Sequence, residues 1–207
     1  IMSGAFPISS SAFSPMGIKS IQNTIISKSD SGKKLARQID GQRFAFTAQI
    51  ITGKRSDIYG ELMAFIIKQR SQKENFTIIP PEIEDARGVE TGTLAVNGSH
   101  TVGDTTIAID GFAADTANRL RAGDFIKFNG HTKVYMVVAD VTSSSGAATV
   151  TIEPPLTTAL SDDEAVAYDN IPFTVHLTND VQEFGAVSAD KDGNVLYQFE
   201  LDVEEAL

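Results

Sequence analysis

The sequence has 207 residues, 42% of them hydrophobic and 21% charged, and its formal net charge of −10 argues against a general nucleic-acid-binding protein, because phosphate contacts need a basic surface. It holds no apolar run near the roughly 18 residues of a membrane-spanning helix, and its start lacks the basic and apolar segments of a secretory signal, so we expect neither membrane insertion nor secretion. Sixteen glycines and seven prolines indicate many turns and therefore a β-rich protein.

The first segment has the pattern of paired strands. Residues 16–28 alternate loosely between apolar and polar and predict a strand, residues 29–32 carry a turn signal, and residues 33–40 would be the returning strand. Residues 43–52 then alternate strictly. This predicts a half-buried strand whose apolar face is made by Phe44, Phe46, Ala48 and Ile50.

One helix is predicted, over residues 56–72. Ser56 suits the N-cap position, and a stripe at helical spacing would pack one face of the helix on the sheet. The stripe consists of Tyr59, Leu62, Met63 and Ile66. A short strand at 76–79 then ends at Pro80–Pro81.

The double proline and the polar segment after it mark a domain boundary. Beyond it, short strands alternate with turn signals at Asn97–Gly98, Asp110–Gly111 and 143–146, and a helical turn is expected at 113–121. Strands of this spacing suit a small antiparallel barrel. The expected strands are residues 93–96, 105–109, 125–128, 133–141, 148–152 and 165–168.

Within the barrel, residues 121–140 have the pattern of a hairpin. Asn129–Gly130 lies between two apolar-rich runs and predicts a tight type I′ turn, in which both central residues need positive φ. The side chains expected to line the barrel core are Phe125, Phe128, Val134 and Met136.

Pro172 marks a second boundary, after which strands are expected at 173–177 and 195–203, with turn material at Asp192–Gly193. We therefore expect a discontinuous domain made of residues 1–86 and 171–207. Residues 87–170 would form the inserted barrel domain.

The two ends of the chain are expected to fold together. Residues 1–86 carry a net charge of +3 and residues 171–207 carry −7, so the two segments attract each other. The last strand, 196–203, is expected in the same sheet as the strand at 44–50. Its apolar positions do not all share one face, which predicts a bulge near Phe199–Glu200.

The sequence offers little catalytic chemistry. It has no phosphate-binding glycine loop, no zinc-protease motif and no nucleophile elbow, and without cysteine it has no thiolate chemistry and suits a reducing cytoplasm. His100, His131 and His176 lie in three separate segments without the spacing of paired metal ligands. We predict no catalytic site, no metal and no cofactor.

Two acidic patterns are interpreted as loops. Residues 190–194, DKDGN, begin like a calcium-binding loop, but the glycine is fourth instead of sixth, so a hairpin turn is favoured. The carboxylate clusters at 162–164 and at Glu82, Glu84 and Asp85 would serve a glycosidase only if one carboxyl were buried, and both lie in loop-like sequence.

Four short segments carry a resemblance to a known family: AGDFIKFNGHTKVYMV at 122–137, SSSG at 143–146, TIEPPL at 151–156 and LYQFEL at 196–201. Together with the order of elements, they resemble the distal tail proteins of long-tailed bacteriophages, in the compact form that carries an inserted OB-fold domain. The resemblance implies a mainly β (α+β) fold. It would combine a tail-tube-like β-sandwich domain bearing one helix with a small inserted OB-fold-like β-barrel.

The resemblance also implies a structural role in the virion. The chain would form a homo-oligomeric ring, a hexamer, between the tail tube and the hub, tip or fibre proteins of the tail tip, and would let DNA pass. It would be made in the cytoplasm of the host bacterium. The helix stripe of Tyr59, Leu62, Met63 and Ile66 would pack in the ring. An acidic chain fits this role, because a negative lumen does not retain DNA.

Two alternatives remain open at this point. The chain could be another phage tail or neck connector protein. It could also be a binding module whose barrel contacts a host-surface glycan weakly, with His131, Lys133 and Tyr135 as the candidate contacts. Nucleic-acid binding by the barrel is disfavoured, because residues 87–170 hold five basic against eleven acidic residues.

Overall fold

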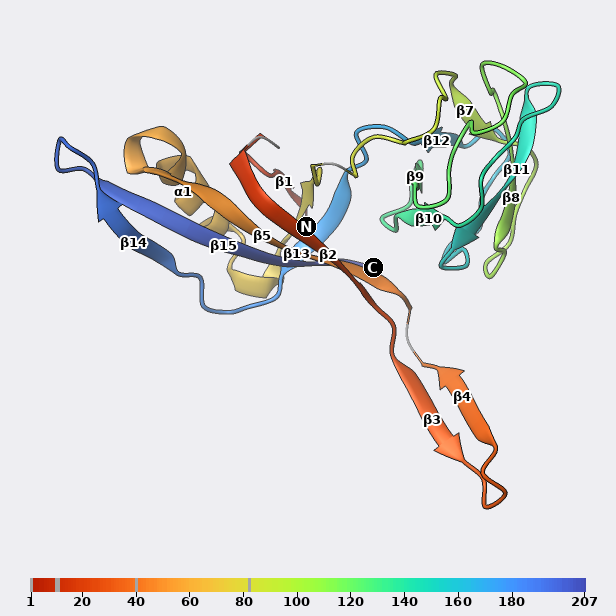
Figure 1. The fold of residues 1–207 in the computed structure, drawn as a ribbon, viewed down its shortest axis with the longest axis horizontal. Coiled ribbons are helices and arrows are strands. Elements are labelled where there is room, and N and C mark those ends of the chain that lie inside the picture. The colour runs from red at the N-terminus through yellow and green to blue at the C-terminus, as the bar shows by residue number, and fades with distance from the viewer. Residues whose placement is uncertain (1, 10–11, 40, 82) are drawn as a thin grey trace. The chain divides into compact units, whose positions relative to one another are not determined.

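The structure is a computed structural model that describes residues 2–9, 12–39, 41–81 and 83–207. The described chain is mainly β, with one α-helix and a small closed barrel, as the sequence predicts (Figure 1). It forms two compact units, unit 1 from residues 1–78 with 174–207, and unit 2 from residues 79–173. Unit 1 thus ends eight residues before the expected boundary at 86 and resumes three residues after the expected one at 171.

Unit 1 consists of one large sheet, a separate hairpin and a short helical segment. Its strands are β1 (Met2–Ala5), β2 (Phe13–Ile21), β3 (Thr24–Lys28), β4 (Lys34–Gln38), β5 (Arg43–Lys54), β6 (Asn75–Ile78), β13 (Phe173–Leu177), β14 (Phe184–Ala189) and β15 (Val195–Glu205). Its helical segment comprises the π-helical turn η2 (Arg55–Tyr59), α1 (Gly60–Lys68) and the 3₁₀ turn η3 (Ser71–Lys73).

The large sheet of unit 1 joins the two ends of the chain. Its strand order is β1-β6-β13-β15-β5-β2, and β14 pairs with β15 beside β13. The last strand β15 pairs antiparallel with β5 along the register Leu196↔Lys54 to Glu204↔Ala45. The prediction that the last strand shares a sheet with the strand at 44–50 is therefore confirmed. The register shifts between Tyr197 and Phe199, so the irregularity begins one to two residues before the predicted bulge.

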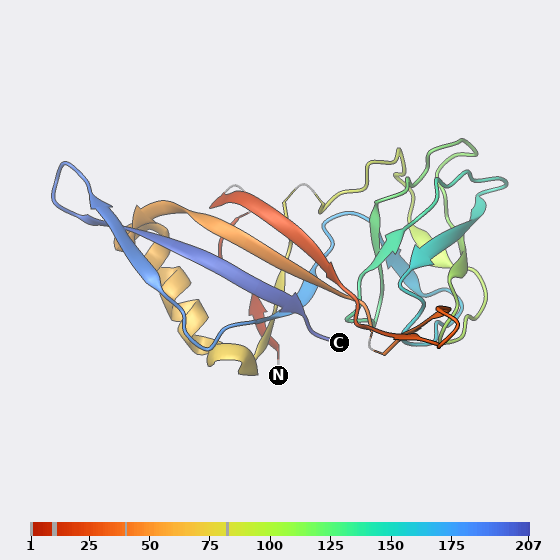
Figure 2. The same cartoon turned by 60° about the horizontal axis from the view of Figure 1, so that its bottom comes forward.

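The core of unit 1 lies between α1 and one face of this sheet. Along β5 the alternating apolar side chains are all buried, as predicted: Phe44, Phe46, Ala48 and Ile50. From β15 they meet Phe199, Leu201 and Val203, and from the helical segment Tyr59, Leu62 and Ile66. Figures 1 and 2 show α1 lying along the sheet near β5 and β15.

The sheet curls until its two edges approach each other. Phe6 follows β1 at one edge, and its ring stacks 5.7 Å from that of Phe13 in β2 at the other edge. Phe65 of α1 and Phe76 of β6 complete the cluster, with rings 5.4 Å apart in an edge-to-face arrangement. The curled sheet and its helix therefore enclose one apolar core, as the two layers of a sandwich do.

The helix is shorter than the sequence predicts. Regular α-helix covers only Gly60–Lys68, and the Ser56 side chain bonds to Asp57 instead of capping the helix. A π-helical turn at 55–59 replaces the expected first turn, and Arg70 in the left-handed conformation (φ 54°) ends the helix before 72. The predicted burial of the stripe holds for Tyr59, Leu62 and Ile66, while Met63 is half-buried.

Unit 2 is a closed barrel. Its strands are β7 (Leu94–Val96), β8 (Thr106–Asp110), β9 (Phe125–Phe128), β10 (Tyr135–Val137), β11 (Ala147–Glu153) and β12 (Ala165–Ala167), each within the range predicted for it or extending at most one residue beyond. They close in the order β10-β11-β8-β7-β12-β9, and each neighbouring pair is antiparallel. Residues 113–121 form bends and no helical turn, so that expectation is wrong.

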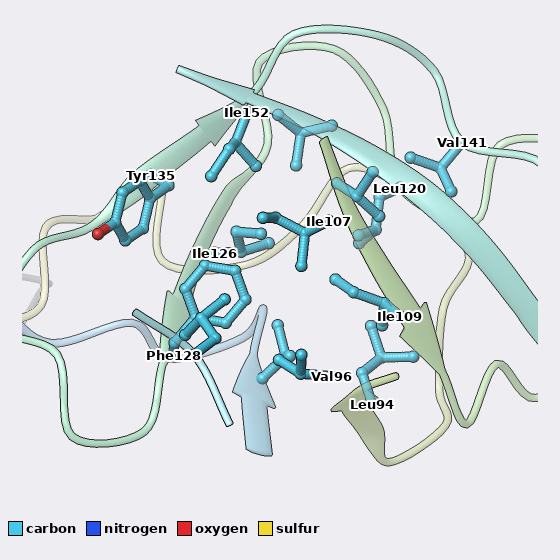
Figure 3. Packing of buried hydrophobic residues seen from close by; sticks show 14 of the residues in the cluster. Leu94, Val96, Ile107, Ile109, Leu120, Ile126, Phe128, Tyr135, Val141 and Ile152 are labelled. Atoms are coloured by element: carbon cyan, nitrogen blue, oxygen red, sulfur yellow. The ribbon is translucent and has the colours of Figure 1, made fainter. Parts of the chain in front are cut away.

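The barrel is filled by branched aliphatic and aromatic side chains, many of which Figure 3 shows converging on one centre. The buried cluster comprises Leu94, Val96, Ile107, Ile109, Phe112, Leu120, Ile126, Phe128, Tyr135, Val137, Val141, Val150, Ile152, Leu156, Leu160 and Val166. Such filling leaves a packed interior without a channel, as in other small barrels.

Of the four side chains predicted to line the barrel core, Phe128 does so, and Ile126 takes the place of Phe125 in the cluster. Tyr135 and Val137 belong to the barrel cluster, whereas the predicted Val134 and Met136 do not. Because side chains alternate along a strand, one misjudged residue exchanges the two faces. The turn also differs from type I′: Gly130 has positive φ (82°) but Asn129 does not, and the His131 N–H donates to the Phe128 carbonyl.

Candidate functional site

The residues suggested as ligand contacts on the barrel lie together but mostly inside it. Tyr135 is fully buried, and its hydroxyl lies 3.2 Å from His131 Nδ1 and 2.9 Å from Thr157 Oγ1. Lys133 is 1% exposed, and its Nζ donates to the Val134 carbonyl at 2.9 Å. Neither side chain therefore presents a polar group at the surface, which weakens the case for Lys133 and Tyr135 as ligand contacts.

His131 borders a hollow of about 340 Å³ on the barrel, and Lys133 and Tyr135 are not among the residues that line this hollow. Its floor is largely backbone and apolar side chains from β9, β12 and Pro172, and Lys127 at its rim donates to the Pro172 carbonyl at 2.6 Å. Glu164 Oε1 lies 3.9 Å from His131 Nε2. The hollow therefore offers one imidazole, a carboxylate close to it and few other polar groups, a poor match for the many hydroxyls of a sugar.

One buried ion pair stands out in unit 2, between Glu90 and Arg119. Arg119 Nε lies 2.6 Å from Glu90 Oε2, and the two side chains are 5% and 0% exposed. The other carboxylate oxygen accepts backbone N–H groups of Thr91, Gly92 and Ala113. Burial raises the pKa of the Glu90 carboxyl, but the guanidinium and these three donors outweigh it and lower the pKa to about 2.

This ion pair holds loops rather than a reacting group. Its backbone donors belong to the segments before β7 and after β8, so the carboxylate ties the two segments together. Asp124 plays the same part at another corner, where it accepts the N–H groups of Arg87, Gly88 and Arg121. A carboxylate with a pKa near 2 and its lone pairs occupied is unsuited to general acid–base work at neutral pH.

The remaining titratable residues are dispersed. Among the described residues no three His, Asp or Glu side chains are grouped so as to hold a metal ion. His100 Nε2 accepts the Ala108 N–H, and His176 lies on β13 opposite Glu204. Of the two acidic clusters, Asp162 accepts the Gly98 N–H, while Glu82 lies outside the described residues.

The DKDGN segment is a hairpin turn between β14 and β15. Asp190 Oδ1 accepts the N–H groups of Asp192 and Asn194, and Gly193 has φ 82°. Lys54 forms an ion pair with Asp190, and this pair together with the Asn194 hydrogen bonds lowers the Asp190 pKa. The Asp190 carboxylate therefore holds the turn together, which agrees with the interpretation of this segment as a hairpin turn.

The helix stripe does not offer a surface to a neighbouring molecule. Tyr59, Leu62 and Ile66 are at most 1% exposed and face the core of unit 1. The Tyr59 hydroxyl donates to the Ile51 carbonyl at 3.1 Å, which fixes the helical segment on β5. On the outer side of α1, Ile67 is 72% exposed. Three of the four stripe residues therefore pack inside the unit, while Met63 is half-buried, and the role of this helix in packing a ring stays a prediction.

A prominent exposed feature is the β3–β4 hairpin, residues 24–38, which we call the hairpin arm. All ten of its strand residues are exposed, and it forms a two-stranded sheet of its own (Figure 1). Three of them are large and apolar: Ile25 (57%), Ile26 (55%) and Leu35 (55%). An isolated two-stranded hairpin is marginally stable in water, so this arm has the character of a segment stabilised by a partner.

A second surface feature lies on the outer face of the sheet, between β14, β15 and the loop before β14. It is a hollow of about 430 Å³, which we call the acidic hollow. It is lined by Gln49, Asn179, Val181, Gln182, Glu183, Gly185, Val187, Gln198, Glu200 and Asp202. Three carboxylates and no cation line it, and Val181 and Val187 are 83% and 50% exposed.

Neither a protein-family model nor a curated protein matches this sequence. No helix within the described residues is both long and apolar enough to span a membrane.

Sequence reasoning missed both surface features. The hairpin arm was predicted as paired strands, but nothing local distinguishes an exposed hairpin from one packed on a core. β14, which forms one wall of the acidic hollow, was not predicted, because FGAVSA lacks apolar alternation. The one available signal for the arm was its charge: four basic residues and one acidic residue between 24 and 39 in a chain of net charge −10.

Proposed function

We propose that this chain is a structural subunit that assembles with copies of itself into a ring at the tip of a bacteriophage tail, in the manner of a distal tail protein. The observation that carries the assembly role is the hairpin arm, whose exposed large apolar side chains lie on an unsupported two-stranded sheet. An arm of this kind costs stability in a monomer and gains it when another surface covers it.

The architecture supports the phage assignment. Unit 1 is a curled, sandwich-like sheet with one helix, split by an inserted barrel, the arrangement that the sequence resemblance implies. The barrel is small, closed and antiparallel, which is compatible with an OB-fold. Copies would be made in the bacterial cytoplasm and join the tail tube to hub, tip or fibre proteins.

The charge of the chain fits a ring through which DNA passes. The net charge is −10, and the cations of the hairpin arm would be engaged in subunit contacts. A lumen lined by the remaining acidic surface repels phosphates and does not retain the moving DNA.

Glycan binding by the barrel is the alternative role. The feature in its favour is the hollow beside His131, next to the Glu164 carboxylate. Against it stand the burial of Lys133 and Tyr135, which removes two of the three polar contacts it would need. A glycan-array screen of the whole protein separates this role from assembly: saturable binding that is lost in a His131→Ala variant would establish it.

The native mass of the purified chain tests the ring. We expect a closed assembly, and for six copies of a 22.2 kDa chain a mass of about 133 kDa, visible as an annular particle by electron microscopy. A ring with another number of copies would correct the stoichiometry alone. A chain that stays monomeric by native mass spectrometry from micromolar to submillimolar concentration would overturn the proposal.

A further inference from the structure

The hairpin arm and the acidic hollow are opposite in charge. Between residues 24 and 39 the arm carries Lys28, Lys33, Lys34 and Arg37 against Asp30, a net charge of +3, so the rest of the chain carries −13. The hollow presents Glu183, Glu200 and Asp202 without a cation among its lining residues. Complementary charge of this kind steers association and fixes which surfaces meet.

The two faces of the arm are not equivalent. Residues directly opposite each other in an antiparallel pair share a face, and the register pairs Ile25 with Arg37 and Ser27 with Leu35. This face carries two large apolar side chains and a guanidinium. The other face pairs Lys28 with Lys34 and holds Ile26. The Ile25 face is therefore the one suited to a surface that combines apolar groups with carboxylates.

The acidic hollow is such a surface. Val181 and Val187 are the exposed apolar side chains in its lining. Glu200 lies on the outer face of β15, where it accepts a hydrogen bond from Gln49 Nε2 at 3.3 Å, and neighbouring Phe199 and Leu201 point into the core. The β15 wall of the hollow is therefore backed by the core, while the loop before β14 and β14 itself form the rest of its lining.

We propose that the hairpin arm of one copy binds in the acidic hollow of the next copy, with Ile25 and Leu35 against Val181 and Val187 and with Arg37 near Glu183 and Glu200. This inference rests on the proposed ring and names the contact that builds it. We do not expect the arm to reach the hollow of its own chain, because β3 and β4 lie far from β14, one wall of the hollow, in both views (Figures 1 and 2). The contact joins two different surfaces and is heterologous, the type that generates rings when the rotation closes.

Disulfide trapping tests the contact directly, and the chain has no native cysteine to interfere. One preparation carries Ile25→Cys and the other Val187→Cys, so that a bond between them can only join two copies. After mixing and mild oxidation we expect a dimer band on a non-reducing gel. Ile26→Cys is the matched control, because Ile26 is exposed to nearly the same extent (55% against 57%) on the opposite face of the arm. We expect its yield to be at least several-fold lower.

Charge exchange gives an independent readout. Arg37→Glu and Glu200→Lys should each raise the concentration needed for assembly by about tenfold or more, and the two variants mixed should assemble again through the exchanged pair. The arm residues that these experiments replace, Ile25, Ile26 and Arg37, are all exposed. The circular dichroism spectrum of each variant should therefore remain that of the parent chain.

The outcomes separate this inference from the proposed function. A closed ring with equal trapping from Ile25→Cys and Ile26→Cys, and with no effect of charge exchange, would overturn the arm-to-hollow contact and leave the ring standing. Specific trapping in open chains or pairs of copies that never close would support the contact and overturn the ring. A chain that is monomeric at all concentrations overturns both, and trapping only in the presence of another tail protein would overturn the choice of a second copy as the occupant.

Discussion

Replacing Glu90 by glutamine removes one buried charge from unit 2 while keeping the shape of the side chain. In the native chain one carboxylate oxygen accepts the Arg119 guanidinium and the other accepts three backbone N–H groups. The glutamine amide has one oxygen and one NH₂ group, so its NH₂ would face either the Arg119 guanidinium or the three backbone N–H groups, donor against donor. Arg119 would also remain buried without its counter-charge, and its Nη2 has no hydrogen-bond partner even in the native chain.

The size of the effect follows from the pKa. Lowering the Glu90 pKa from its ordinary value of 4.5 to about 2 corresponds to a contribution of about 3 kcal/mol to stability, at 1.36 kcal/mol for each pKa unit. This agrees with the roughly 3–5 kcal/mol typical for removal of one partner of a buried ion pair. A carboxyl whose pKa is lowered by folding makes its full contribution to the stability of the folded chain at pH values above its unfolded pKa, near 4.5. That contribution is lost as the pH falls toward the folded pKa, about 2.

The expected signature is a difference that depends on pH. Near pH 7 the Glu90→Gln barrel should be less stable than the parent by about 3 kcal/mol. The difference should shrink between pH 4.5 and pH 2, because in this range the Glu90 carboxylate of the unfolded parent chain is protonated while that of the folded chain is still ionised. Hydrogen exchange of the β7–β12 amides with added denaturant, compared between the two chains at each pH, measures this difference. Asp163→Asn, at an exposed position in the same unit, is the control. A Glu90→Gln difference that stayed constant from pH 7 to pH 2 would refute the electrostatic reasoning.

Three further variants test the packing. Gly111→Ala should destabilise the barrel by several kcal/mol, because the added Cβ would lie 2.0 Å from the Thr93 carbonyl oxygen. Gly98 has a similar φ but open space around it, so Gly98→Ala should cost only about 1–2 kcal/mol. Thermal denaturation of the two variants measures the difference. Truncation after Asn194 removes the central strand β15 and should unfold unit 1 while the barrel stays resistant to protease, since each large buried side chain contributes about 1.5–3 kcal/mol. Tyr135→Phe should cost about 1 kcal/mol in barrel stability by the same hydrogen-exchange measurement, because it leaves the Thr157 hydroxyl without one of its partners.

The strands of the barrel could be predicted closely because turn residues mark their ends. Gly98, Gly111, Gly130 and Gly146 all have positive φ, and each lies between or beside strands where the sequence placed a turn. A glycine requirement of this kind is local, so it can be recognised without knowing the partner strand.

The inward face of a short strand is harder to predict. Val134, Tyr135, Met136 and Val137 are consecutive apolar residues, so alternation gives no phase, and the choice depends on which strand lies opposite. Here Tyr135 pairs with Ile126 and points inward, where His131 and Thr157 satisfy its hydroxyl. Which groups satisfy a buried hydroxyl depends on the tertiary fold and cannot be seen in the local sequence. For the same reason the sequence suggests Lys133 and Tyr135 as surface contacts, although both side chains are buried.

The hairpin arm illustrates the complementary limit. The strands of the arm contain Ile25, Ile26 and Leu35, residue types that also occur in strands packed on a core. Such residues favour a β-hairpin whether or not a core covers it. Whether these side chains are buried depends on elements that lie elsewhere in the chain or, as we propose, in another copy. A sequence read one chain at a time therefore recovers the element and misses its exposure.

The point at which the barrel is inserted leaves the sheet of unit 1 intact. The strands that flank the insertion, β6 and β13, are neighbours in the sheet, so the chain leaves unit 1 and returns to it at adjacent positions. An insertion between adjacent strands breaks no strand pairing, and the register of β15 with β5 and β13 is kept. The edge strands β2 and β14 and the hairpin arm are then untouched by the insertion. Substitutions on the barrel surface can therefore change what the barrel contacts without altering the surfaces of unit 1 through which, as we propose, copies assemble.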